Sequence, residues 1–77
     1  MTTPRASLAL ALDDACGQIH QAWREGHSPT TIALGPALFE IVRSARRREL
    51  ATGAPLLLLD LHLVEDDRLV GDEVTVT

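Results

Sequence analysis

The most apolar stretch of the chain runs from Leu56 to Val64 and reads Leu-Leu-Leu-Leu-Asp-Leu-His-Leu-Val. It follows a glycine and a proline, Gly53 and Pro55, and it precedes the charged run 65–68. Proline cannot donate to a strand ladder, so a sheet segment is expected to begin after it. Nine residues suit a strand and are few for a helix. We therefore predict that this stretch is the central strand and that the other elements pack against it or pair with it.

The predicted strand has two unlike faces, because alternate side chains of a strand point to opposite sides of the sheet. One face is wholly apolar and is expected to face the core; it carries Leu57, Leu59, Leu61 and Leu63. The second face is apolar only at its beginning; it carries Leu56, Leu58, Asp60, His62 and Val64. The sequence thus predicts one buried face and one face of mixed character.

Two segments have the apolar spacing of amphipathic helices. The first has Thr3 as its predicted N-cap, ends at Gly26, and is expected to bury Leu8, Leu12, Ala15, Ile19, Ala22 and Trp23. The second opens at Gly35-Pro36, ends at Thr52-Gly53, and is expected to bury Ala37, Leu38, Ile41, Val42, Ala45 and Leu50. Each helix therefore has one apolar stripe to place against a sheet.

Two shorter strands are predicted, from Thr30 to Leu34 and from Glu73 to Thr77. The first is expected to lie parallel to the central strand, because the second helix connects the two. The last is expected to return beside the central strand as an antiparallel hairpin. This order, α-β-α-β-β, predicts an α+β fold in which two helices pack on one face of a small three-stranded mixed sheet. We expect one domain over residues 1–77.

Chain length and cysteine content favour self-association. A chain of 77 residues buries only about 60 to 65% of the surface that it exposes when unfolded. Its single cysteine permits no internal disulfide, and small domains without disulfides or metals commonly gain stability by oligomerising. We expect a homo-oligomer whose interface includes Leu56, Leu58, Asp60 and His62. The alternative is a solvated face on which the two leucines are covered by the chain termini.

Two groups of side chains have a spacing suited to chemistry. Cys16 and His20 are four residues apart with Asp13 one turn earlier, a spacing that can begin a metal site or activate a thiolate. Cys16 also adjoins the apolar stripe, where a buried sulfhydryl is the usual outcome. Asp60 and His62 place a carboxylate beside an imidazole, but no nucleophile motif or phosphate-binding loop accompanies them. We expect no metal, no cofactor and no catalytic residue; a small enzyme using Cys16 or His62 is an alternative.

Four arginines lie within six residues of the second helix: Arg43, Arg46, Arg47 and Arg48. The first three share a helix face that can contact an acidic protein surface or phosphates, and Glu40 and Glu49 neutralise part of that charge. The net charge of −4 opposes general attraction to nucleic acid or to an anionic membrane. The arginines are interpreted as a solvated face or a charged protein contact. A small regulator that binds a protein or nucleic acid through residues 43–48 is an alternative.

The order of elements between Thr31 and Asp72 resembles a known family. Thr31-Ile32-Ala33-Leu34-Gly35-Pro36 leads into a helix with Leu38, Ile41 and Arg43, then an apolar strand, an acidic turn and Leu69-Val70-Gly71-Asp72. This order resembles the axial domain of tailed-phage capsid proteins of the HK97 type, and it is similar to short phage structural proteins. The resemblance implies a virion or mobile-element protein that assembles by protein contacts. It transfers no site residues.

Together these patterns predict a non-enzymatic protein-interaction or assembly module that self-associates. Its partners are expected to be proteins, and we expect neither nucleic acid nor a membrane to be among them. No export signal and no membrane-spanning segment is recognised in the sequence. The expected location is the cytoplasm, or a virion if the phage resemblance applies.

Overall fold

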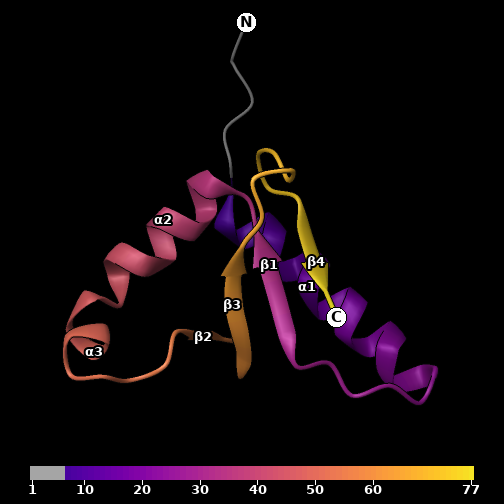
Figure 1. The fold of residues 1–77 in the computed structure, drawn as a ribbon. Coiled ribbons are helices and arrows are strands. Elements are labelled where there is room, and N and C mark those ends of the chain that lie inside the picture. Colours follow the sequence, from indigo (N-terminus) through magenta and orange to yellow (C-terminus); the bar gives the residue numbers. More distant parts are fainter. Residues whose placement is uncertain (1–6) are drawn as a thin grey trace, which may run out of the picture.

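The computed structural model describes residues 7–77 as helices packed against a four-stranded sheet (Figure 1). The elements in chain order are α1 (Leu8–Arg24), β1 (Thr31–Leu34), α2 (Pro36–Ala45), α3 (Arg47–Ala51), β2 (Leu57–Leu58), β3 (Leu61–Glu65) and β4 (Val74–Val76). The predicted α+β fold, with helices on a small mixed sheet, is confirmed, although the sheet has four strands and not three. The predicted N-cap Thr3 lies outside the described residues. Ser7 caps α1, and its hydroxyl oxygen accepts a hydrogen bond from the Leu10 N–H at 3.3 Å.

β1 lies inside the sheet, whose strand order is β2-β3-β1-β4. It pairs in parallel with β3, as the strand-helix-strand pattern predicts, and antiparallel with β4. The predicted hairpin between β4 and the apolar run is therefore wrong. The second edge of β3 is already paired with β2. The remaining edge of β1 is thus the place where the last strand can join the ladder.

The apolar run from Leu56 to Val64 reverses direction at Leu59 and Asp60, so the prediction of one continuous strand is wrong. These two residues have φ values of 53° and 64° and connect β2 to β3 as a two-residue hairpin turn, with Leu58 opposite Leu61. Turns with positive φ at both central residues match the right-handed twist of paired strands. Opposed residues of a hairpin lie on the same face of the sheet. The turn therefore moves Leu58 to the same face as Leu61, where uninterrupted alternation predicts opposite faces.

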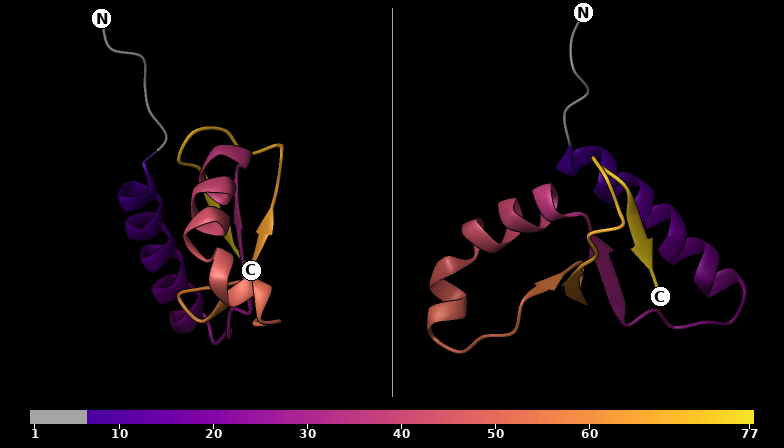
Figure 2. Two further views of the ribbon diagram at one scale, coloured as in Figure 1. Left: turned by 90° about the vertical axis from the view of Figure 1, so that its left-hand side faces the viewer. Right: turned by 45° about the horizontal axis from the view of Figure 1, so that its top comes forward.

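One face of the sheet forms the core with the helices. Its buried side chains are Ile32 and Leu34 of β1, Leu58 of β2, Leu61 and Leu63 of β3, and Val74 of β4. They meet Ala11 and Ala15 of α1 and Leu38 and Val42 of α2. Figure 2 shows α1 along one side of the sheet and no helix over the other side, while α2 lies beside β3. The described part of the chain thus covers the sheet on one face.

The helices bury fewer residues than their sequence pattern predicts. In α1 the fully buried residues are Ala11 and Ala15, whose small side chains let the helix approach the sheet closely, whereas Trp23 is 59% exposed. The predicted second helix breaks at Arg46, where φ is −106° and ψ is 21°, and continues as α3. In α2 only Leu38 and Val42 are buried, and Ile41 is 49% exposed.

The acidic connection between β3 and β4 is held against the end of β1. The Asp66 N–H donates a hydrogen bond to the Leu34 carbonyl oxygen at 2.9 Å. A Cβ atom at Gly35 would lie 2.6 Å from the Leu69 carbonyl oxygen, so this close approach requires glycine. The connection then enters β4 on the far side of β1 from β3.

The hairpin turn can be tested with the residues that two-residue turns prefer. Replacing Leu59 by Asn and Asp60 by Gly should raise the free energy of unfolding by roughly 1 kcal/mol, because both residues tolerate positive φ. Chemical denaturation of the double variant measures this change. In a continuous strand the same pair would instead destabilise by about 1 kcal/mol or more.

A glycine on β3 is the matched control for this experiment. His62→Gly removes an exposed side chain from a regular strand position and should lower the free energy of unfolding by roughly 0.5 to 1 kcal/mol. Opposite signs for the two glycine variants support the turn at Leu59 and Asp60. Destabilisation by both would contradict it.

Candidate interaction surfaces

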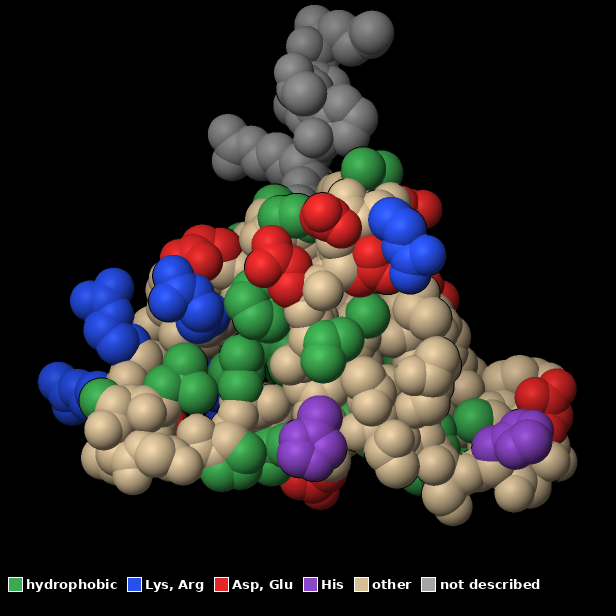
Figure 3. All heavy atoms as spheres, viewed as in Figure 1, with side chains coloured by type: hydrophobic (Ala, Val, Ile, Leu, Met, Phe, Trp, Pro, Cys, Tyr) green, Lys and Arg blue, Asp and Glu red, His purple; other side chains and the backbone are tan. Residues whose placement is uncertain are grey.

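The uncovered face of the sheet carries six side chains from its four strands. We call this surface the open face; it consists of Thr31, Ala33, Leu57, His62, Val64 and Thr75. Register defines the set, because Leu57 and Thr31 are opposite His62, and Ala33 is opposite both Val64 and Thr75. Val64 is 42% exposed, and Leu57 and Ala33 are half-buried. The view in Figure 3 is toward this face, where hydrophobic side chains gather over and beside β3.

Only one of the four predicted interface residues stands on the open face. His62 does, and it is exposed. Leu58 is 8% exposed in the core, Leu56 is half-buried and packs against the core, and Asp60 is a turn residue. The placement of Leu56 and Leu58 on the face of His62 is therefore wrong, because the turn reverses the alternation of side chains before it. Leu57, predicted for the core, takes the place opposite His62.

The outer edge of β4 is closed by a side chain of α1. The Gln18 amide nitrogen donates to the Val74 carbonyl oxygen at 2.8 Å, and its amide oxygen accepts from the Val76 N–H at 2.9 Å. A neighbouring strand would satisfy the same two backbone groups. Gln18 therefore occupies the positions through which another strand would extend the sheet. Sequence patterns do not signal this role, since a glutamine on a helix is ordinary.

Removal of the Gln18 amide should destabilise the protein, because β4 loses two hydrogen bonds. Gln18→Ala leaves a part-buried carbonyl and an N–H of β4 without these partners, and should lower the free energy of unfolding by about 1 to 3 kcal/mol. Hydrogen exchange at the Val76 amide should accelerate as well. Gln21→Ala is the control, because the Gln21 amide donates a hydrogen bond to the exposed Glu25 carboxylate, and its loss should change stability by less than about 0.5 kcal/mol. Equal stabilities for the two variants would contradict the role of Gln18.

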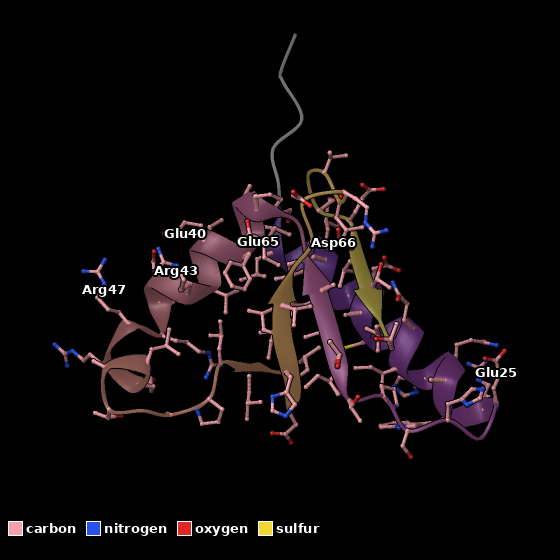
Figure 4. The ribbon with its side chains drawn as sticks, viewed as in Figure 1. Glu25, Glu40, Arg43, Arg47, Glu65 and Asp66 are labelled. Atoms are coloured by element: carbon pink, nitrogen blue, oxygen red, sulfur yellow. The ribbon has the colours of Figure 1, made fainter. Side chains whose placement is uncertain are left out.

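The predicted arginine face is divided by the helix break at Arg46. Arg43 remains on α2 and donates to Glu40 through Nε at 3.0 Å and through Nη2 at 2.6 Å. The hydrogen bonds from Arg43 lower the pKa of the Glu40 carboxyl from its ordinary value. Arg46 is at the break, and Arg47 projects outward from α3 (Figure 4). Within residues 7–77 the ion pairs are Arg43–Glu40 and Arg68–Asp66, so Arg46, Arg47 and Arg48 are exposed without one.

Within residues 7–77, the side chains predicted as alternative reactive groups do not form a site. Cys16 is exposed, so the prediction that it is a buried core residue is wrong. Among the described residues, no group of three or more His, Cys, Asp and Glu side chains is placed to hold a metal ion. Asp60 is in the hairpin turn, whereas His62 is in β3. Asp13, Cys16 and His20 are therefore exposed residues of α1.

The exposed position of Cys16 predicts fast modification. A thiol reagent should react with the native protein at nearly the rate measured in denaturant, because Cys16 is an exposed residue. Absorbance of the released thiol-reagent product measures both rates. Native labelling slower by a factor of about a hundred or more would place Cys16 in the core instead.

Two cavities lie at the C-terminal end of α1. One, of about 470 Å³, is bounded by the end of α1, the connector to β1 and β4, and includes Glu25, His27 and Ser28. Glu25 accepts a hydrogen bond from Gln21, and within the described residues no hydrogen bond joins the other two into a nucleophile–base pair. The other, of about 360 Å³, lies between α1 and the hairpin turn and is lined by Ile19, Trp23, Pro29, Leu59, Asp60 and Leu61. We call it the Trp23 groove.

Comparisons of the chain with family models, with curated proteins and with solved structures found no match. Across residues 7–77, no helix has the length and apolar character needed to cross a bilayer. The candidate interaction surfaces are therefore assigned from the geometry of this chain alone.

Proposed function

We propose that the protein is a non-enzymatic interaction module that self-associates through the open face. The observation that carries the proposal is the uncovered sheet face, on which Ala33 is opposite Val64 and Leu57 is opposite His62. Apolar side chains on one face of a sheet gain about 25 cal/mol for each Å² of apolar surface that a partner removes from water. A second layer over this face would thus stabilise the small core.

The chemistry of the open face suits a second copy of the same surface. No carboxylate and no arginine belongs to its six residues, so two copies can approach without repulsion between carboxylates or between arginines of this surface, despite the net charge of −4. Threonine and valine side chains are β-branched and form a stiff surface of low relief. Sheets pack face to face at about 10 Å in such arrangements. A two-fold contact places the same residues on both sides, as homodimers commonly do.

The alternative route to self-association, pairing of strand edges, has little support. The β4 edge is bonded to Gln18, and the other edge strand, β2, has only two residues. Short edge strands and covered edges discourage pairing with another chain. Face packing is therefore the mode that the open surface favours.

The phage resemblance extends this proposal without adding residues to it. A capsid-like assembly role would use protein contacts of the kind described, and it would place the protein in a virion. The cytoplasm is the location proposed where that role does not apply.

The proposal is tested at Val64. Light scattering of the native protein at micromolar concentration should give a mass above 8.3 kDa. Val64→Lys adds a charge at the centre of the proposed contact and should reduce the mass to that of the single chain, or weaken association by about tenfold or more. A monomeric native protein at high concentration would refute the proposal.

Val70→Lys is the matched control for Val64→Lys. Val70 is 69% exposed in the connection between β3 and β4, away from the open face, and its replacement makes the same change in charge and size. Its mass in solution should equal that of the unchanged protein. Circular dichroism should show the same fold for both variants. Equal loss of association in both would indicate a general charge effect and would contradict the assignment of the open face.

A further inference from the structure

The Trp23 groove exposes two large apolar side chains at its rim. Trp23 projects from the C-terminal half of α1 with 59% of its surface exposed, and Leu59 in the hairpin turn is 40% exposed. Ile19 and Pro29 are half-buried beside them, and Leu61 forms the buried floor. Trp is the residue most enriched among the contacts that dominate binding energy at protein interfaces. The groove therefore has the composition of a recognition site and is separate from the open face.

The groove is bounded by a leucine with an uncommon backbone conformation and by a tryptophan with a neighbouring ring. Leu59 has a φ of 53°, a left-handed conformation in which a bulky side chain is uncommon. Strained backbone of this kind concentrates at binding sites, where the surrounding structure maintains it. The His20 ring lies 5.4 Å from the Trp23 ring, centroid to centroid, and is tilted by 58°, which supports one side of the indole.

The groove combines an aromatic ring, apolar walls and one carboxylate. Asp60 follows Leu59 in the hairpin turn, also lines the groove, and supplies its carboxylate. A guanidinium group can stack on an indole ring and pair with a carboxylate, while its methylene stem packs on apolar surface. An arginine side chain is thus the ligand whose chemistry matches all three features.

We propose that the Trp23 groove receives an arginine side chain from Arg46 or Arg47 of a second copy of this chain. Residues 36–51 hold four arginines and two glutamates and so carry a net charge of +2 in a chain whose total is −4. Arg46 and Arg47 are exposed at the junction of α2 and α3 and have no ion pair within the described residues. The inference rests on the proposed self-association for the identity of the partner, but it uses different residues.

Trp23 is the only tryptophan in the chain, so its fluorescence reports directly on the groove. A trace of the unchanged protein is titrated with an excess of Trp23→Phe protein, which is silent under selective excitation but keeps the arginines. Occupation of the groove removes water from the indole, so the emission of Trp23 should shift to shorter wavelength with a saturating concentration dependence. Phe in place of an exposed Trp should leave the fold of the silent protein intact, as circular dichroism can verify.

Three variants identify the contact. Arg46→Gln with Arg47→Gln in the silent protein should weaken the titration by about tenfold or more. Arg43→Gln with Arg68→Gln in the silent protein makes the same change in charge and should leave the titration unchanged, because these arginines pair within their own chain. Asp60→Asn in the fluorescent protein should weaken the titration about threefold to tenfold, and asparagine tolerates the positive φ at that position.

The outcomes separate this inference from the proposed function. An emission shift that depends on Arg46, Arg47 and Asp60 supports the groove contact. An unchanged emission at concentrations where light scattering detects the oligomer overturns the groove contact and leaves self-association in place. A shift that survives Arg46→Gln with Arg47→Gln also overturns it, because another ligand then fills the groove. A protein that remains monomeric, with no emission change, overturns both.

Discussion

The turn at Leu59 and Asp60 determines how the apolar run of the chain is used. By reversing direction after two residues, it brings Leu58 opposite Leu61 and Leu57 opposite His62. The first pair enters the core, and the second belongs to the open face. The same turn presents Leu59 and Asp60 to the groove beside Trp23. The core, the open face and the groove therefore all depend on two residues with positive φ.

In the described part of the chain, the sheet is covered by helices on one face and uncovered on the other. This difference favours contact through the open face over pairing of strand edges. Helices and alanine-rich packing close one face, and the Gln18 amide closes the outer edge of β4. The opposite face keeps polar and apolar side chains, with no carboxylate or arginine among them, in contact with solvent. A protein protected at its edges and open on its face can associate by side-chain packing while avoiding strand-to-strand aggregation.

The two proposed contacts differ in symmetry. The open face is suited to a contact in which both copies use the same residues, whereas the groove joins unlike surfaces, an aromatic groove with a carboxylate and an arginine-bearing helix end. Contacts of the first kind close a dimer, and contacts of the second kind close a ring or extend into a chain. A module that has both can build assemblies larger than a dimer. This would also account for arginines that have no partner within their own described chain.

Much of the fold was predictable from local patterns. Periodicity alone predicted α1, α2, β1 and β4 and the parallel pairing of β1 with β3, because these depend on side-chain spacing and short connections. Tertiary structure alone decided the break at Leu59 and Asp60, the pairing of β4 with β1, and the exposure of Cys16 and Trp23. An apolar run contains no glycine or asparagine to mark a turn, and a helix stripe does not state how far the sheet extends beneath it. The pairing of β4 depends on which strand edge is still free, and the exposure of helix residues depends on how much apolar sheet surface lies beneath the helix. Both are decided only when the whole chain has packed.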